Sequence, residues 1–342
     1  MRGNIVMALA FAGGAQFCQT AARAQSVEQF YAGKTISFIV GAGAGGSYDL
    51  YARALASHMP KYIPGKPQMV VKIAGGVGGG IGTAIQIEHA APKDGTTIGM
   101  TQQTNVTSQL TEESVKGKFD ISKWRWIGNM APLRNFIGVW HTAAAQTLEE
   151  AKTKEVIVGA TGRTSPTFIV PQAVNELIGT KFKFVLGYNG VADLNLAMER
   201  GEIQARGGAW LSVVTTTPAY ISEKKLKPLV VDGLTRDPLL PDVPTLLDLA
   251  RTPDQKAAAA VICGSSEFAR AVFLPPGVPQ DRVDALRRAF DATMKDPEFL
   301  AEAARIQIVI EPQSGENLDR TAAEIVKTPA AAIALAKKLL GE

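Results

Sequence analysis

A strand–helix alternation that occurs twice along the chain constrains its fold more than any other feature. In the first occurrence, apolar strands at 35–40, 69–73 and 96–100 are separated by two segments with a helical pattern. In the second, strands at 155–160, 182–186 and 202–206 alternate with helices, and a last strand follows at 229–231. Such alternation is typical of parallel sheets with right-handed crossovers. The sequence therefore predicts an α/β protein with two mainly parallel sheets.

The two repeats predict two lobes, and a chain of 342 residues is long enough for each to have its own core. The stretches at 124–131 and 268–274 would link the lobes, and helices predicted at 281–294 and 298–305 would return to the first. We therefore expect a first lobe made of 25–126 plus 271–342, and a second lobe made of 127–270.

The N-terminus has the pattern of a cleavable signal peptide. Arg2 precedes a mostly apolar stretch at 5–17, and Ala22-Arg23-Ala24 gives a small-x-small cleavage site. The alternative is an N-terminal helix of the mature fold. Cleavage after Ala24 would remove Cys18 and leave Cys263 as the only cysteine, with a net charge of 34 − 32 = +2. A single cysteine forms no internal disulfide and is most simply a buried small hydrophobe. The sequence predicts an exported protein.

A glycine-rich loop follows the first strand. Gly41-Ala42-Gly43-Ala44-Gly45-Gly46 satisfies G-x-G-x-x-G between a strand and a helix, the context of a dinucleotide site. That site also needs an acidic residue at the end of the second strand, and no Asp or Glu occurs from Pro60 to Ile87. A phosphate loop would need a lysine after Gly46, which is absent. The sequence therefore predicts no nucleotide and no other cofactor.

Three loops at predicted carboxyl ends of strands could instead bind an anion. They span 41–49, 74–82 and 161–166, and each precedes a helix. Glycine lets the backbone approach a ligand, and free N–H groups at a helix start attract negative charge. This edge is also where open parallel sheets bind ligands. The alternative is that the glycines serve only tight packing.

Other function classes lack their residues. The three histidines, His58, His89 and His141, belong to no recognisable motif, and H-E-x-x-H, C-x-x-C and G-x-S-x-G are absent. The densest basic cluster, at Lys224, Lys225 and Lys227, has no interleaved aromatic residues. We therefore expect no catalysis, no metal and no nucleic acid, with a secreted α/β enzyme as the weaker alternative.

With these loops placed, the sequence resembles the Bug-type receptors of tripartite tricarboxylate transporters from Tyr31 to about Glu316. The opening block is Tyr31-Ala32-Gly33-Lys34-Thr35-Ile36, followed by Gly45-Gly46-Ser47-Tyr48-Asp49-Leu50-Tyr51-Ala52-Arg53. Then come Gly78-Gly79-Gly80-Ile81-Gly82, Ala91-Pro92-Lys93-Asp94-Gly95-Thr96, Gly187-Tyr188-Asn189-Gly190 and Glu199-Arg200-Gly201-Glu202-Ile203. Leu240-Pro241-Asp242-Val243-Pro244-Thr245 and Leu274-Pro275-Pro276-Gly277-Val278-Pro279 end the series. Each block is weak alone, and the ordered set is specific.

The resemblance implies a type II periplasmic binding fold with a ligand cleft between its two lobes. It also implies a monomeric periplasmic receptor that delivers a dicarboxylate, tricarboxylate or aromatic acid to a two-component membrane permease. A ligand-sensing partner of a membrane sensor kinase is the alternative. The chain departs from the family at Gly75, where a proline is usual, and at Arg206, near the end of a predicted strand, where an acidic or amide residue is usual.

These considerations give a set of candidate ligand-binding residues. In the first lobe, Ala44, Gly45, Gly46 and Ser47 would donate to a carboxylate, Asp49 would orient the loop or a water, and Gly78, Gly79, Thr101, Gln102 and Thr104 would line the pocket. In the second lobe, Thr161, Thr164 and Ser165 lie at a helix start, and Tyr188 and Trp210 would form aromatic walls. Ser165 as a plain helix cap and the aromatics as core residues are the alternatives. Arg206 suits bidentate carboxylate recognition, unless it is a surface arginine paired with Glu199 or Glu202.

Overall fold

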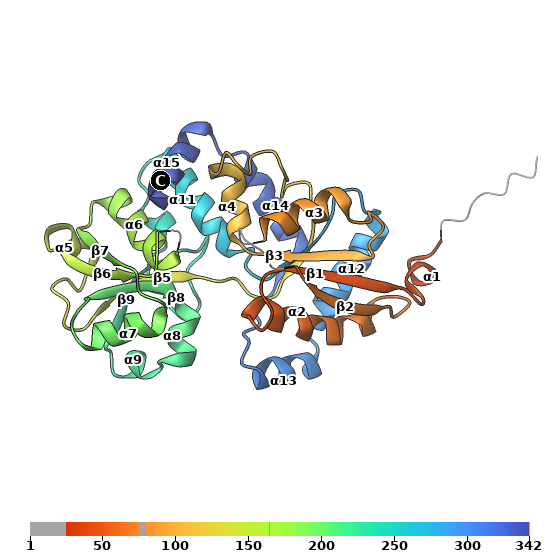
Figure 1. The fold of residues 1–342 in the computed structure, drawn as a ribbon, viewed down its shortest axis with the longest axis horizontal. Coiled ribbons are helices and arrows are strands. Elements are labelled where there is room, and N and C mark those ends of the chain that lie inside the picture. The colour runs from red at the N-terminus through yellow and green to blue at the C-terminus, as the bar shows by residue number, and fades with distance from the viewer. Residues whose placement is uncertain (1–24, 75–79, 164, 342) are drawn as a thin grey trace, which may run out of the picture.

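The computed structural model describes residues 25–74, 80–163 and 165–341. The predicted signal peptide at 1–24 therefore lies outside the described residues. Within them, no helix is both long and apolar enough to span a bilayer. The described chain forms two sheets that lie side by side, each with helices on both faces (Figure 1).

The first sheet has the strand order β11-β4-β10-β3-β1-β2. Its strands are β1 (Thr35–Gly41), β2 (Gln68–Ile73), β3 (Thr97–Thr101), β4 (Arg125–Asn129), β10 (Ala271–Leu274) and β11 (Gln313–Ser314). Strand β1 pairs in parallel with β2 and β3, whereas β10 and β11 pair antiparallel with their neighbours. Strands β1, β2 and β3, which pair in parallel, correspond to the three strands of the predicted first repeat.

Two apolar clusters lie on opposite faces of this sheet. One contains residues from α1 (Val27–Tyr31), α2 (Ser47–His58), η1 (Met59–Tyr62), α12 (Gln280–Thr293) and α13 (Pro297–Arg305). The other contains residues from α3 (Ile81–Ala90), α4 (Thr104–Thr111) and α14 (Gly315–Val326). Helices α12 and α13 thus pack on the first sheet.

The second sheet has the strand order β7-β6-β8-β5-β9. Its strands are β5 (Asn135–Trp140), β6 (Val156–Ala160), β7 (Phe182–Leu186), β8 (Ala205–Ala209) and β9 (Leu226–Val231). Strand β6 pairs in parallel with β7 and β8, and β5 pairs antiparallel with β8 and β9. One face carries α5 (Leu148–Thr153), α6 (Pro166–Ile178), α10 (Leu246–Leu249) and α11 (Pro253–Ser266). The other carries α7 (Val191–Glu199), α8 (Trp210–Thr216) and α9 (Ala219–Ser222).

The two crossings between the sheets run close together. Met130 N donates to Arg270 O at 3.3 Å, and Leu133 N donates to Ser266 O at 3.0 Å. The flanking residues, predicted only as linkers, form the antiparallel strands β4 and β10 inside the first sheet. Pairing with neighbouring strands satisfies backbone groups that a bare linker would leave to solvent.

The C-terminal helix α15 (Ala330–Leu340) lies apart from the first sheet. It packs against α6 and α11, and its buried Ala336 and Leu339 belong to the second lobe's core (Figure 1). The expected boundary, which gave all of 271–342 to the first lobe, is therefore wrong for this helix. An alanine-rich helix with one apolar side packs on whichever core offers it a groove, and its own sequence does not specify which.

Candidate functional site

The loop between β1 and α2 presents an uncapped helix start to solvent. Gly43 to Ser47 are exposed, and Gly46, the residue before the helix, contributes no side-chain cap. The first amides of a helix have no acceptor within it, so they remain donors for an anion. Gly80 packs against this loop with φ +85°, and a Cβ there would lie 2.5 Å from Gly41 O. Glycine at 80 is thus required for the close approach of two predicted loops.

The Asp49 carboxylate fixes this loop through two contacts. Its Oδ2 accepts from Gly45 N at 2.8 Å, and its Oδ1 pairs with Arg53 Nε at 2.7 Å. Asp49 is 5% exposed as a residue, which leaves its carboxylate little access to a ligand. This geometry favours the loop-orienting interpretation of Asp49 over contact with an anion.

Arg270 contacts the same loop and is not among the predicted residues. Its Nη2 donates to Ser47 Oγ at 3.0 Å, and its Cζ lies 4.4 Å from the centroid of the Tyr48 ring. Ser47 and Arg270 are 223 positions apart, so only the fold brings them together. The sequence offers no local signal for this contact.

The end of β3 lies next to the end of β1. Thr101 is buried, and its Cγ2 would contact a Cβ at Gly41 at 3.2 Å. Gln102 is half-buried and Thr104, the first residue of α4, is exposed. Gln103 N donates to Tyr48 Oη at 3.3 Å, which joins this turn to α2. The structure thus groups Ala44–Ser47 with Thr101–Thr104. Gly78 and Gly79 lie outside the described residues.

In the second lobe, the hydroxyls before α6 are engaged with one another. Ser165 caps the helix by accepting from Thr167 N at 3.2 Å, and Thr167 Oγ1 accepts from Thr161 N at 3.0 Å. Thr167 is buried and connects the predicted residues, although it was not itself predicted. The capping role proposed as the alternative for Ser165 is therefore present. Thr164 lies outside the described residues.

Arg206 is completely buried and carries no ion pair. Strand β8 starts three residues later than predicted, so Arg206 is its second residue, with 0% exposure. Its Nη1 donates to Gly207 O at 3.2 Å, whereas Nε and Nη2 have no partner in the described part of the chain. Glu202 pairs with Arg200, and Glu199 accepts from Tyr220 Oη. The interpretation of Arg206 as a paired surface arginine is wrong.

The buried arginines of the described residues fall into two classes. Arg134 pairs with Glu311 at 3.0 Å, and Arg287 pairs with both Glu316 and Asp319. Arg206 and Arg270 contact no acidic side chain among the described residues. Burial without a counter-charge lowers the pKa of Arg206 to about 10. Buried charges are normally paired, so two unpaired arginines are unusual.

The predicted aromatic walls differ in position. Tyr188 is half-buried and packs beside Gly159, where a Cβ would lie 3.3 Å from its ring. Trp210 is buried edge-to-face on Phe136, with ring centroids 5.2 Å apart. Trp210 also lines a cavity of about 250 Å³ between the lobes. The other walls of this cavity are 132–134, Leu211, 237–239 and 309–311.

The Gly43–Ser47 loop and the Thr161–Thr167 turn belong to different lobes. Across the described ranges, no hydrogen bond or ion pair joins the Gly43–Ser47 loop to the Thr161–Thr167 turn. The residues predicted for the cleft therefore form two separate groups, one in each lobe.

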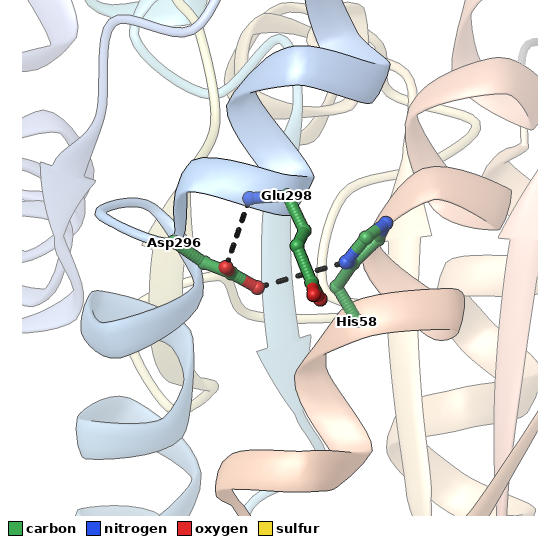
Figure 2. A group of neighbouring side chains, drawn as sticks. All are labelled: His58, Asp296 and Glu298. Atoms are coloured by element: carbon green, nitrogen blue, oxygen red, sulfur yellow. Dashed lines mark hydrogen bonds and ion pairs between the residues drawn. The ribbon is translucent and has the colours of Figure 1, made fainter.

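His58, Asp296 and Glu298 form a cluster with metal-ligand chemistry between α2 and α13 (Figure 2). Lys61 already supplies a cation there, since its Nζ lies 2.5 Å from Asp296 Oδ2 and 2.7 Å from Glu298 Oε2. His58 Nε2 contacts Glu302 Oε2 at 2.7 Å, and Lys61 lowers the pKa of Asp296. We interpret the cluster as an ion-pair network that fastens α13 to α2.

Comparison with known proteins places these observations in a family. A curated relative, the UPF0065 protein of the gbd 5′ region of Cupriavidus necator, is 25% identical over 91% of this chain and 90% of its own. A TctC solute-binding protein from Polaromonas has a TM-score of 0.69 at 22% identity, covering 90% of this chain and 98% of that one. These similarities span nearly the whole chain.

Two further solved structures are similar in fold and contain ligands. An R. palustris protein with adipate has a TM-score of 0.56 at 17% identity, covering 90% of this chain and 97% of that one. MatC from Rhodopseudomonas palustris with malate has a TM-score of 0.54 at 18% identity, covering 87% and 99%. The two-lobe α/β fold predicted from the sequence is confirmed by these structures.

The family itself is shown by a direct match. The sequence model of the tripartite tricarboxylate transporter family receptor, TctC, matches residues 51–335. This match confirms a solute-binding receptor in place of the weaker alternative of a secreted enzyme. The chain belongs to the TctC family of tripartite tricarboxylate transporter receptors.

Proposed function

We propose that this receptor binds a small organic carboxylate between its lobes and delivers it to a two-component membrane permease. The observation that carries the proposal is the start of α2, where the exposed Gly46 has no side-chain cap and the buried Arg270 donates to Ser47. Amide donors and a nearby fixed cation are a suitable environment for a carboxylate. The adipate and malate bound by two proteins of similar fold agree with this chemistry.

The ligand that fits best is a dicarboxylate. One carboxylate would take the amides of Gly46 and Ser47, since the Gly45 amide already donates to Asp49, and the other would approach Arg206 from the side of the Thr161–Ser165 turn. Arg206 is completely buried, so this second contact would require a rearrangement of the second lobe. The ligand would then stabilise the closed arrangement through its tighter grip on that state.

The cellular setting is also part of the proposal. Cleavage of residues 1–24 would release the receptor into the periplasm, where a monomer would carry its ligand to the permease. The dispersed charge of the mature chain, 34 − 32 = +2, gives a nucleic acid no strong attraction.

Calorimetric titration of the mature protein, residues 25–342, tests the proposal. Adipate, its monoacid analogue hexanoate and the neutral diamide adipamide differ only in their terminal groups. We expect adipate to bind most tightly, hexanoate more weakly and adipamide not at all. Adipate at a hundredfold excess over its Kd should stabilise the fold by about 2.7 kcal/mol. Failure of adipate, malate and a panel of aromatic acids to bind would contradict the proposed function.

A further inference from the structure

We infer that Arg270 is the positioning residue that gives the α2 loop its charge and joins that loop to the crossings between the lobes. The inference rests on the proposed function, because it assigns to Arg270 a role in carboxylate binding. It concerns a residue outside every motif that identifies the loop.

The guanidinium is held in one position. Its Cζ lies 4.4 Å from the Tyr48 ring centroid and 5.1 Å from that of Tyr51, so the cation contacts two aromatic rings of α2. Tyr51 Oη is fixed in turn, since it donates to Val309 O at 2.8 Å and accepts from Val309 N at 3.1 Å. Arg270 Nη1 donates to Ala269 O at 2.9 Å. The cation therefore has little freedom to move away from the loop.

The charge of this guanidinium has no acidic partner. Arg270 is 6% exposed, and among the described residues it donates to Ser47 Oγ and Ala269 O and to no carboxylate, with Nε unpartnered. Aromatic rings stabilise a cation without neutralising it. A carboxylate bound at the exposed amides above it would supply the missing counter-charge. The same cation then favours a charged ligand over a neutral one of equal shape.

Arg270 acts on the ligand through Ser47. The Ser47 oxygen accepts from Arg270 Nη2 at 3.0 Å, which leaves the hydroxyl proton free for a different acceptor. A hydroxyl that accepts from a cation becomes a stronger donor, because hydrogen bonds in a chain polarise one another. Ser47 is exposed at the first position of α2, where that proton can reach a ligand.

The backbone of Arg270 belongs to the crossings. Arg270 N donates to Asn129 Oδ1 at 3.0 Å, Arg270 O accepts from Met130 N at 3.3 Å, and Asn129 Nδ2 donates to Glu267 O at 2.7 Å. Arg270, which belongs to one crossing segment, thus contacts the Gly43–Ser47 loop with its side chain and the other crossing segment with its main chain. A ligand that draws the loop and the guanidinium together acts directly on the segments that set the angle between the lobes.

The test compares R270Q and R270K with the wild-type mature protein by calorimetry at two salt concentrations and by small-angle X-ray scattering. In R270Q we expect adipate affinity to fall about tenfold or more, the scale of a charge-assisted hydrogen bond. The salt dependence of Kd and the ligand-induced decrease in radius of gyration should shrink with it. R270K keeps the cation and should recover part of the salt dependence. S47A should weaken binding less, and its effect should largely disappear in the R270Q background.

The outcomes separate this inference from the proposed function. If wild-type protein binds no carboxylate, the proposed function fails and the inference with it. If wild-type protein binds adipate and R270Q binds it equally well with unchanged salt dependence, only the inference is overturned. If R270Q does not fold, R270K and S47A decide, and wild-type affinity in both would overturn it.

Discussion

Replacing Arg206 with methionine should make the ligand-free receptor more stable while weakening its binding of a dicarboxylate. Burial lowers the pKa of Arg206 from its ordinary 12.5 to about 10, because no counter-charge among the described residues offsets the loss of water. One pKa unit corresponds to about 1.4 kcal/mol, so the folded state bears a cost of about 3 kcal/mol for keeping this cation. The folded pKa lies below the unfolded one. The cost is therefore complete at neutral pH and disappears only as pH rises from about 10 towards 12.5.

Methionine has a similar length and no charge, so Arg206→Met should raise the free energy of unfolding by about 1 to 3 kcal/mol. Urea unfolding of the mature protein at pH 7.5, followed by tryptophan fluorescence, measures this change. Calorimetry on the same variant should show adipate affinity reduced towards that of hexanoate. A residue with a purely structural role would lower stability when replaced, so the combination of a gain in stability and a loss of affinity identifies a binding residue.

Arg287 provides the matched control. It is also a buried arginine, but it pairs with Glu316 at 3.0 Å and Asp319 at 2.6 Å and donates to Trp126 O at 2.8 Å. Arg287→Met should destabilise the protein by about 1 to 3 kcal/mol, because it leaves the buried Trp126 carbonyl unpaired and removes ion pairs whose carboxylates are partly exposed. The reasoning is refuted if Arg206→Met destabilises the fold as Arg287→Met does, or if it leaves the preference for adipate over hexanoate intact.

Three other predictions concern the loop, a buried carboxyl and export. Gly46→Val should abolish binding of mono- and dicarboxylates alike with little loss of stability, because a Cβ at 46 contacts only Gly43 O at 3.5 Å, and unchanged calorimetry would exclude the loop. Burial raises the pKa of Asp232 from 3.8 to about 8, so stability should fall as pH rises from about 4 to 8. Asp232→Asn should flatten that decline in urea titrations, and an identical decline would show that the proton lies elsewhere. Export should remove residues 1–24, so the intact mass of periplasmic protein should correspond to a chain starting at Gln25, whereas a full-length mass would contradict the signal peptide.

The sequence predicts the two strand–helix repeats well because their periodicity is local. Glycine at 179 ends α6 with φ +75°, and the proline at 166 starts it, as their conformational preferences dictate. The predicted start of β8 is three residues too early, because Glu202 and Ile203 follow α7 in a turn bonded to Ala197 O. A shift of three residues moved Arg206 from the strand end into the sheet. Local strand propensity does not determine at which residue such a strand begins.

Other features depend on contacts between distant segments. The contact of Arg270 with Ser47, the antiparallel pairing of β4 with β10 and the packing of α15 on the second lobe all arise from the tertiary fold. The two partners of each contact lie far apart along the chain, so local sequence patterns do not predict the contact. The exposed loop at Gly43–Ser47 could be predicted because its glycines and its helix start are adjacent in the chain.

A crystal structure of the mature protein with adipate tests the central claim most directly, since the claim is a position for the ligand. We predict one carboxylate at hydrogen-bond distance from the backbone amides of Gly46 and Ser47, with the other end held by the second lobe in a closed arrangement. Adipate bound away from this loop, for example wholly inside the cavity lined by Trp210 and Leu211, would contradict the account.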